Sequence, residues 1–214
     1  MYPVSSEGLN KETKKAVYFY TPSFDALNNF SAHRIEIWDV RFPTAEHAYQ
    51  WKKFYYPPEE SEEDSAVADN QPRTNGGRER VRIGHPSAGE ARAHLTVGAG
   101  VREIRNAIAK QILEAGSPEE AQQIAREHKP LMPSDWHEKK VAVMEAILRA
   151  KLAKHETVRD ALKRSGNRTI IENSPTDGFW GCGKDGNGKN MMGALWMKLR
   201  GYSKKNATHA RISE

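Results

Sequence analysis

The sequence predicts a single, mainly α-helical domain with a small β element, an α+β fold. Over much of the second half of the chain, apolar residues recur at spacings of three and four, which is the period of an amphipathic helix. Only two short segments have the β-branched, aromatic or alternating character of strands. No unit repeats along the chain, and a length of 214 residues fits one domain of ordinary size.

Both strand candidates lie near the start of the chain. Residues 1–15 are polar and charged, which predicts a flexible lead-in. The run 17–20 is β-branched and aromatic, and residues 34–38 alternate polar and apolar side chains, so we expect a strand at each. Phe42-Pro43-Thr44 then introduces a helix, with Thr44 in the N-cap position. From residue 57 to 80 an acidic run and a Pro, Asn and Gly cluster have no periodicity, which predicts disorder.

Five later segments are predicted to be helices. Ser117 followed by Pro118 is typical of an N-cap and a first helical residue. The apolar positions of the other predicted helices are Val101, Ile104, Ile108 and Ile112; Val141, Met144, Leu148 and Leu152; Val158 and Leu162; and Met192, Leu195, Trp196 and Leu199.

Composition limits the partners and the compartment. A net charge of +5 favours polyanions such as phosphates or nucleic acid, although a basic protein without such a partner fits the charge equally well. The single cysteine, Cys182, allows no internal disulfide and indicates a reducing compartment. No apolar run approaches the length of a membrane helix. We therefore expect a soluble intracellular protein, cytoplasmic or nuclear, with no membrane partner; its oligomeric state stays open.

The helix after Pro43 has one face that can carry chemistry. Glu46, Gln50 and Lys53 are spaced i, i+4 and i+7 and therefore share a face. His47, Trp51 and Phe54 form an aromatic stripe on the adjacent face. The plainer interpretation is an amphipathic helix whose Glu46 and Lys53 extend into water.

A glycine-rich loop before the last helix is the strongest ligand signal of the sequence. Between Gly178 and Gly193 glycine recurs every few residues, and the loop leads into a helix. Glycine permits close backbone approach to a ligand, and a helix N-terminus suits phosphate. This loop is neither a nucleotide triphosphatase P-loop nor a calcium loop, because Asn190 stands in place of the P-loop Ser or Thr and Trp196 in place of the calcium-binding glutamate. The histidines lack zinc-ligand spacing, so we predict no metal.

Several separated motifs together resemble the NADAR (YbiA-like) N-glycosidase family. They are Asn29-Phe30; Phe42 to Gln50 with Lys53-Phe54; Asp135-Trp136 with Lys140, Met144 and Ala150-Lys151-Leu152; and Asp177, Phe179-Trp180-Gly181, Gly188, Asn190 and Gly193 through Arg200. The resemblance covers roughly residues 18–56 and 117–200 and implies a YbiA-like compact multihelical domain at 16–202. The chain departs from the family in having Ala26-Leu27-Asn28-Asn29-Phe30 where members read Phe-Ser-Asn-Phe, and in an insertion at about 57–115. Residues 203–214 are expected to form a basic tail.

The resemblance implies hydrolysis of an N-glycosidic bond between ribose C1 and an amine, with no cofactor. Two substrate classes are associated with it: ADP-ribose on the exocyclic amine of guanine in nucleic acid, and ribosylamino-pyrimidine phosphates of riboflavin biosynthesis. The basic charge and the tail from Lys198 to Arg211 favour the first, with DNA ahead of RNA as the nucleic acid. A non-catalytic reader of ADP-ribose or nucleic acid is the alternative from another class.

The predicted roles follow from this chemistry. Glu46 would stabilise positive charge at C1, Asp177 would be a second carboxylate or orient the substrate, and Lys53 would act as a nucleophile that forms a Schiff base. We expect Trp51 or Phe54 to desolvate Lys53, and the loop from Gly181 to Gly188 to cradle phosphate. The residues predicted to bind substrate are Asn29, Phe30, His47, Gln50, Trp136, Trp180, Gly181, Asn190 and Gly193.

Overall fold

The computed structural model describes residues 11–19, 24–57 and 88–212. Their α-helices are α1 (Ala45–Lys52), α3 (Ala88–Glu114), α4 (Pro118–Glu127), α5 (Trp136–Lys154), α6 (Glu156–Ser165) and α7 (Met191–Ile212), with the 3-10 helices η1 (Asp25–Leu27) and η2 (Lys129–Leu131). The strands are β1 (Lys11–Glu12), β2 (Ala16–Phe19), β3 (Ile35–Ile37), β4 (Val40–Phe42) and β5 (Thr169–Glu172). The predicted helix-rich α+β domain is confirmed. No helix in these ranges is both long and apolar enough to cross a membrane.

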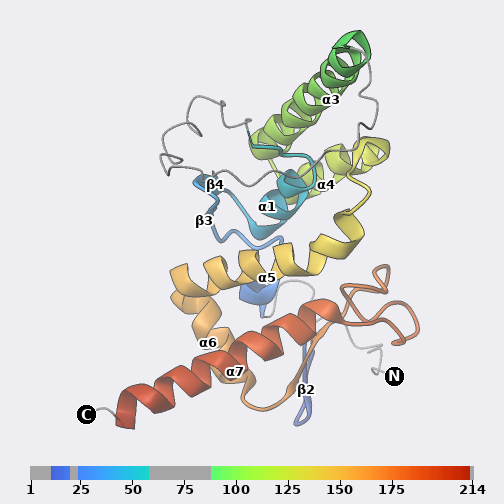
Figure 1. Ribbon diagram of the computed structural model, residues 1–214. Helices are drawn as coiled ribbons and strands as arrows, with labels where there is room; N and C mark the ends of the chain where they lie inside the picture. The colour runs from blue at the N-terminus through green and yellow to red at the C-terminus, as the bar shows by residue number, and fades with distance from the viewer. Residues whose placement is uncertain (1–10, 20–23, 58–87, 213–214) are drawn as a thin grey trace, which may run out of the picture.

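Helix α5 crosses the middle of the molecule and separates two groups of elements (Figure 1). On one side α1, α3 and α4 pack against one another, and α1 also contacts α5. On the other side α7 packs along β5 and touches α5 and α6. Residues from both groups therefore meet beside α5.

A three-stranded sheet has β2 at its centre. Strand β1 pairs antiparallel with β2, and β5 pairs parallel with β2 in the register Val17–Ile170 and Phe19–Glu172. The predicted strand near residues 17–20 is confirmed, whereas β5 was not predicted. The interpretation of residues 1–15 as a lead-in is incomplete, because β1 lies within it and its backbone groups pair with β2.

The second sheet is the hairpin β3–β4, which confirms the strand predicted at 34–38. Its two turn residues, Trp38 and Asp39, have φ of 56° and 59°. Two consecutive left-handed residues match a type I′ turn, which suits the twist of a two-residue hairpin. The hairpin leads directly to Thr44 and α1.

Both predicted N-caps are confirmed. The Thr44 hydroxyl accepts a hydrogen bond from the backbone N–H of His47, and the Ser117 hydroxyl accepts one from that of Glu120. Such caps satisfy N–H groups that have no partner inside the helix. They place the first turns of α1 and α4, and both helices contribute to the pocket described below.

Helix α3 shows how the second half of the predicted insertion at about 57–115 joins the core. Ile108 and Ile112 are buried in the main hydrophobic cluster, so the second half of α3 is part of the core that α1 and α4 share. Ile104, predicted to be on the buried stripe, is 51% exposed. The segment predicted to be disordered, 57–80, lies outside the described residues except for Pro57.

The predicted tail at 203–214 is also corrected. Helix α7 continues to Ile212, so most of this segment is helical. The sequence after Gly201 has no proline to stop the helix, which allows it to continue. The buried face of α7, with Met192, Leu195, Trp196 and Leu199, is the stripe that the spacing predicts.

Candidate active site

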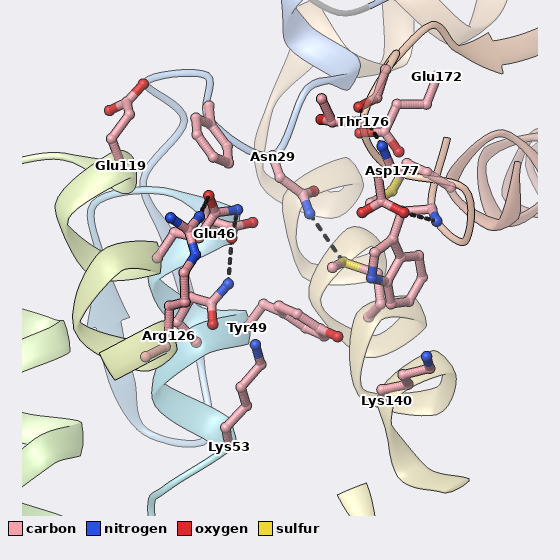
Figure 2. Close-up of a pocket in the computed structure, with 18 of the residues that line it drawn as sticks. Asn29, Glu46, Tyr49, Lys53, Glu119, Arg126, Lys140, Glu172, Thr176 and Asp177 are labelled. Atoms are coloured by element: carbon pink, nitrogen blue, oxygen red, sulfur yellow. Dashed lines mark hydrogen bonds between the residues drawn. The ribbon is translucent and has the colours of Figure 1, made fainter. Parts of the chain in front are cut away.

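One pocket, with a volume of about 710 Å³, lies where α1, α4, α5 and the segment after β5 meet. Figure 2 shows Glu46 and Lys53 on one side, Asp177 and Lys140 on the other, and Asn29 and Tyr49 between them. Eight of the predicted site residues line this pocket: Asn29, Phe30, Glu46, Gln50, Lys53, Trp136, Asp177 and Trp180. The face of α1 and the tryptophan before the glycine-rich loop therefore share one cavity.

Glu46 is a buried carboxyl group held by side-chain amides. Its Oε1 accepts hydrogen bonds from Nε2 of Gln50 at 2.5 Å and from Nε2 of Gln122 at 3.4 Å. Burial raises the pKa of Glu46, while the bond from Gln50 and the charge of Lys53 favour its ionised form. Its backbone N–H is bonded to the Asn29 carbonyl, which ties α1 to the loop carrying Asn29.

Lys53 follows α1 and has its ammonium group 4.9 Å from the centroid of the Tyr49 ring. Burial lowers the pKa of Lys53 to about 8, Glu46 opposes that shift, and Lys140 adds to it. A fraction of this amine is therefore neutral near physiological pH. The prediction that Trp51 or Phe54 desolvates Lys53 is corrected, because the aromatic ring in contact is Tyr49, whereas Trp51 stacks on Trp38 and Tyr55.

Three aromatic residues form one wall of the pocket. The Tyr49 ring lies between Trp136, at 5.3 Å between centroids, and Trp180, at 5.6 Å. Trp136 is the first residue of α5, and Trp180 comes from the loop before α7. Burial raises the pKa of the Tyr49 hydroxyl, so the phenol remains neutral. This wall offers a surface against which a base or sugar face can pack.

Asp177 uses one carboxylate oxygen to shape its own loop. Its Oδ1 accepts hydrogen bonds from the backbone N–H groups of Phe179 at 2.8 Å and Trp180 at 2.7 Å. This is the Asx-type turn in which a side chain replaces a backbone acceptor. The bonds fix the position of the Trp180 ring against Tyr49, so Asp177 orients the aromatic wall in addition to lining the pocket.

Glu172 is a pocket residue that the sequence analysis did not single out. It is the last residue of β5, and its Oε2 is buried with no hydrogen-bond partner among the described residues. Burial, with the neighbouring charges of Asp177 and Glu46, raises the pKa of Glu172 to about 8. At neutral pH this side chain is therefore mainly a carboxylic acid.

The buried polar side-chain atoms without a partner gather at the pocket. Within the described ranges there are three such atoms, Asn29 Oδ1, Gln50 Oε1 and Glu172 Oε2. All three belong to residues that line this cavity. An unpaired buried polar atom costs roughly 1–3 kcal/mol, so a cluster of them indicates a place where a ligand completes the bonding. The two amide oxygens require hydrogen-bond donors, such as sugar hydroxyls.

Four cationic side chains line the pocket from different elements. They are Lys53 at the end of α1, Arg126 on α4, Lys129 on η2 and Lys140 on α5. The Lys140 ammonium lies 3.3 Å from the centroid of the Phe179 ring, and burial together with Lys189 lowers its pKa. Positive charges grouped in this way suit an anionic ligand.

His47 is buried beside the pocket but does not line it. Its Nε2 donates to the Ala115 carbonyl at 3.1 Å, which leaves Nδ1 to accept from the Thr44 hydroxyl at 2.8 Å. Burial lowers the pKa of His47, in agreement with a neutral ring. The structure therefore gives His47 a structural role, joining α1 to the end of α3, in place of the predicted substrate contact.

The glycine-rich loop is the largest correction to the predicted site. Gly181, Asn190 and Gly193 do not line the pocket. The Asn190 side chain is buried against β5, where Nδ2 donates to the Ile170 carbonyl and Oδ1 accepts from the Glu172 N–H, each at 2.9 Å. A Cβ on Gly193 would come within 2.0 Å of the Ile170 oxygen, so this glycine serves close packing of α7 on β5.

The start of α7 is likewise occupied by the protein itself. The N–H groups of Asn190, Met191 and Met192 donate to backbone carbonyls of Gly181, Phe179 and Trp180, respectively. A helix N-terminus attracts phosphate through N–H groups that have no partner. These groups have partners, so the structure does not bring the predicted phosphate cradle to the pocket.

No group of three His, Cys, Asp or Glu side chains is arranged to hold a metal ion in the part of the chain described. The prediction that the protein uses no cofactor stays a prediction.

Comparison with known proteins agrees with this geometry. Residues 99–202 match the family model of the NADAR domain. An N-glycosidase of Nostoc punctiforme is 28% identical over 186 residues, which cover 86% of this chain and 90% of the relative. The riboflavin biosynthesis protein PYRR of Zea mays is 28% identical over 186 residues, 83% of this chain but only 23% of the relative.

The fold has a solved counterpart. The NMR structure of the Escherichia coli protein YbiA superposes with a TM-score of 0.61 at 23% sequence identity, covering 96% of this chain and 95% of that one. The NADAR match contains α5, β5 and the Trp180 loop, and the comparison with the Nostoc protein extends over most of the chain. The protein is thus similar to the NADAR (YbiA-like) family in sequence and in fold.

Proposed function

We propose that this protein is an N-glycosidase that hydrolyses the bond between ribose C1 and an exocyclic amine. The observation that carries the proposal is a group of buried oxygens, of Asn29, Gln50 and Glu172, that have no partner within the described ranges. They lie in the cavity that also contains Glu46 and Lys53. A ribose supplies hydroxyl donors for the two amide oxygens and places C1 within a site that holds an amine and a carboxyl group. The names of the Nostoc protein and of YbiA as N-glycosidases support the same reaction class.

Lys53 would act as the nucleophile. An N-riboside of an exocyclic amine can open to an imine, and the neutral Lys53 amine adds to its C1. The substrate amine then departs with the bonding electron pair and a proton, which leaves C1 joined to Lys53 as a Schiff base. Water hydrolyses this intermediate to the sugar aldehyde and restores the lysine. The lowered pKa of Lys53 supplies the neutral amine that the first step needs.

Glu46 would stabilise positive charge during these steps. The amide bonds from Gln50 and Gln122 orient its carboxyl group on the same helix face as Lys53. When C1 becomes an iminium carbon, a carboxylate beside it lowers the energy of the cation. The prediction for Asp177 is refined by its hydrogen bonds: it positions Trp180 through Oδ1 and stands on the opposite side of the cavity.

ADP-ribose attached to guanine in nucleic acid is the substrate that we place first. A pocket of about 710 Å³ with four lining cations suits a large ligand that carries phosphate groups. The net charge of +5 also favours a nucleic acid. An exocyclic guanine adduct projects from the base, so the modified group reaches a pocket with less unstacking than the ring itself would need.

A ribosylamino-pyrimidine phosphate is the second candidate. The maize relative and a relative from Vibrio vulnificus are named riboflavin biosynthesis proteins, which favours an intermediate of that kind. This compound also has a ribose C1–amine bond and a phosphate, so the same residues would serve it.

Product analysis tests the function and separates the candidates. The protein is incubated with DNA containing ADP-ribosylated guanine and, separately, with the ribosylamino-pyrimidine phosphate, and products are identified by mass spectrometry. We expect free ADP-ribose and intact guanine from the first, with the Glu46→Gln variant as an inactive control. Release of the pyrimidine alone favours the second candidate. If the protein binds both compounds but releases no product from either, the proposed N-glycosidase function is wrong and the protein is a non-catalytic reader.

A further inference from the structure

Glu172 is held in place by the glycine-rich loop. Its backbone N–H donates to Asn190 Oδ1, and its carbonyl accepts from the N–H of Cys182, both at 2.9 Å. The loop packs so closely that a Cβ on Gly181 would lie 2.8 Å from the Glu172 carbonyl oxygen. The loop that was predicted to hold phosphate therefore fixes the end of β5 and with it the start of the Glu172 side chain.

The carboxyl group of Glu172 differs from those of Glu46 and Asp177, while the fourth acid that lines the pocket, Glu119, is exposed. Glu46 accepts hydrogen bonds from two side-chain amides and faces Lys53, while Asp177 accepts two backbone N–H bonds. Both are placed as hydrogen-bond acceptors. Glu172 Oε2 is buried and lacks any such donor among the described residues, and the neighbouring acids oppose its ionisation. Of the four acids that line the pocket, Glu172 is therefore the one suited to carry a proton into the reaction.

We propose that Glu172 is the general acid that protonates the leaving amine when the C1–N bond breaks. This assignment rests on the N-glycosidase function proposed above. The proton moves from the Glu172 carboxyl to the amine nitrogen while the bonding pair passes to that nitrogen, leaving a Glu172 carboxylate. Water that attacks C1 in the hydrolytic step then returns a proton to this carboxylate, so the acid is restored once per turnover.

The chemical reason is the poor leaving ability of an amine. Without protonation the departing nitrogen would carry negative charge, and a positioned acid typically contributes about 10²–10⁴-fold to such a step. A buried, neutral carboxylic acid is the arrangement by which glycosidases protonate their leaving group. The dependence of the rate on the leaving group is therefore a direct readout of this role.

The test uses two N-aryl ribosylamine 5-phosphates, one releasing aniline and the other 4-nitroaniline. The nitro group stabilises the departing nitrogen, so this amine needs less protonation. Wild-type protein, Glu172→Gln and the exposed control Glu138→Gln are compared in kcat, with the Kd for ribose 5-phosphate and the unfolding midpoint measured for each. We expect Glu172→Gln to lose about a hundredfold or more on the aniline compound and less than about tenfold on the nitroaniline compound, with Kd unchanged.

Equal losses on both compounds, or none on either, would overturn the assignment of Glu172 while leaving the enzyme intact. If Glu172 only positioned the substrate, Glu172→Gln would lower the two rates by the same factor, and this result would contradict its role as general acid. If the wild-type protein hydrolyses neither compound and also fails the product assay above, the N-glycosidase function fails and the Glu172 proposal falls with it. Normal activity of Glu138→Gln would show that exchanging an exposed carboxylate for an amide outside the pocket does not by itself lower the rate.

Discussion

Two regions of this chain have the sequence character of a ligand site, and they use their polar groups in opposite ways. The face of α1 turns Glu46, Gln50 and Lys53 toward the cavity, where Gln50 Oε1 has no partner among the residues that the structure describes. The loop from Gly181 to Asn190 directs its hydrogen bonds to β5 and to the start of α7. A glycine-rich loop before a helix therefore signals close backbone approach, and the approaching group can be another part of the same protein.

Each region is necessary for a different property. The α1 side chains that face the cavity should determine turnover with little effect on folding. Residues of the loop should determine stability, since their partners are buried backbone groups of β5. Substitutions in the two regions can therefore confirm this division or contradict it.

The largest effect is expected at Lys53. Lys53→Ala removes the proposed nucleophile, so the covalent intermediate cannot form. We expect kcat to fall by about a thousandfold or more. Borohydride added during turnover of the wild-type protein should reduce the Schiff base and join the sugar to Lys53, which peptide mass spectrometry detects.

The adjacent lysine provides a matched control. The Lys52 ammonium lies 4.7 Å from the centroid of the Trp38 ring and does not line the pocket, so Lys52→Ala should retain normal turnover. If Lys53→Ala is as active as wild type and no borohydride adduct forms, Lys53 is not the nucleophile.

The loop is tested at Asn190. Asn190→Ala leaves the Ile170 carbonyl and the Glu172 N–H without partners, and each such buried group costs about 1–3 kcal/mol. Position 190 also has φ of 49°, a conformation that alanine adopts less readily than asparagine. We expect the free energy of unfolding to fall by about 3–5 kcal/mol in a denaturant titration.

Asn187→Ala is the control for this measurement, because Asn187 is exposed in the same loop and should change stability by less than about 0.5 kcal/mol. Unchanged stability of Asn190→Ala, accompanied by weaker ligand binding, would return the loop to the role of a ligand site.

The sequence alone predicted those elements whose signals come from residues close together in the chain. The caps at Thr44 and Ser117 and the apolar stripes of α5 and α7 each depend on neighbouring residues, and the structure has them as predicted. Strand β5 was missed because Thr169–Glu172 is only four residues long and lacks alternation, which a short buried strand need not have. Its identity depends on pairing with β2, which lies some 150 residues earlier in the chain.

The site was predictable to the extent that it lies on one helix. Glu46, Gln50 and Lys53 share a face by spacing alone, and Tyr49 could have been included on the same ground, at i+3 from Glu46. Glu172 could not be identified in this way, because its distinguishing property arises only on folding: within the described part of the chain, its Oε2 is buried without a partner. Asn190 and Gly193 were misassigned for a related reason: glycine content predicts close contact but not the identity of the contacting group.

A third effect concerns pH. Lys53 acts as a neutral amine, so activity should fall about tenfold for each pH unit below its pKa of about 8. Glu172 acts as an acid, so activity should fall in the same way above its pKa of about 8. The profile of kcat/KM for wild-type protein should therefore be a narrow bell with its maximum near pH 8. In Glu172→Gln the fall at high pH should disappear while the fall at low pH remains; a flat low-pH side would contradict the role of Lys53.

The smallest effect compares two lysines, one from the pocket and one from the loop. Lys140 lines the cavity, whereas Lys184 is exposed in the glycine-rich loop and does not line it. Either change to alanine removes one positive charge, so long-range attraction of an anionic substrate is reduced about equally. Only Lys140→Ala removes a direct charge-assisted contact, and KM should rise about tenfold with kcat little changed. Lys184→Ala should leave KM near the wild-type value. If KM rises for Lys184→Ala and not for Lys140→Ala, the substrate phosphate binds at the loop. Both variants lose one positive charge, so a difference in KM must come from where each lysine lies.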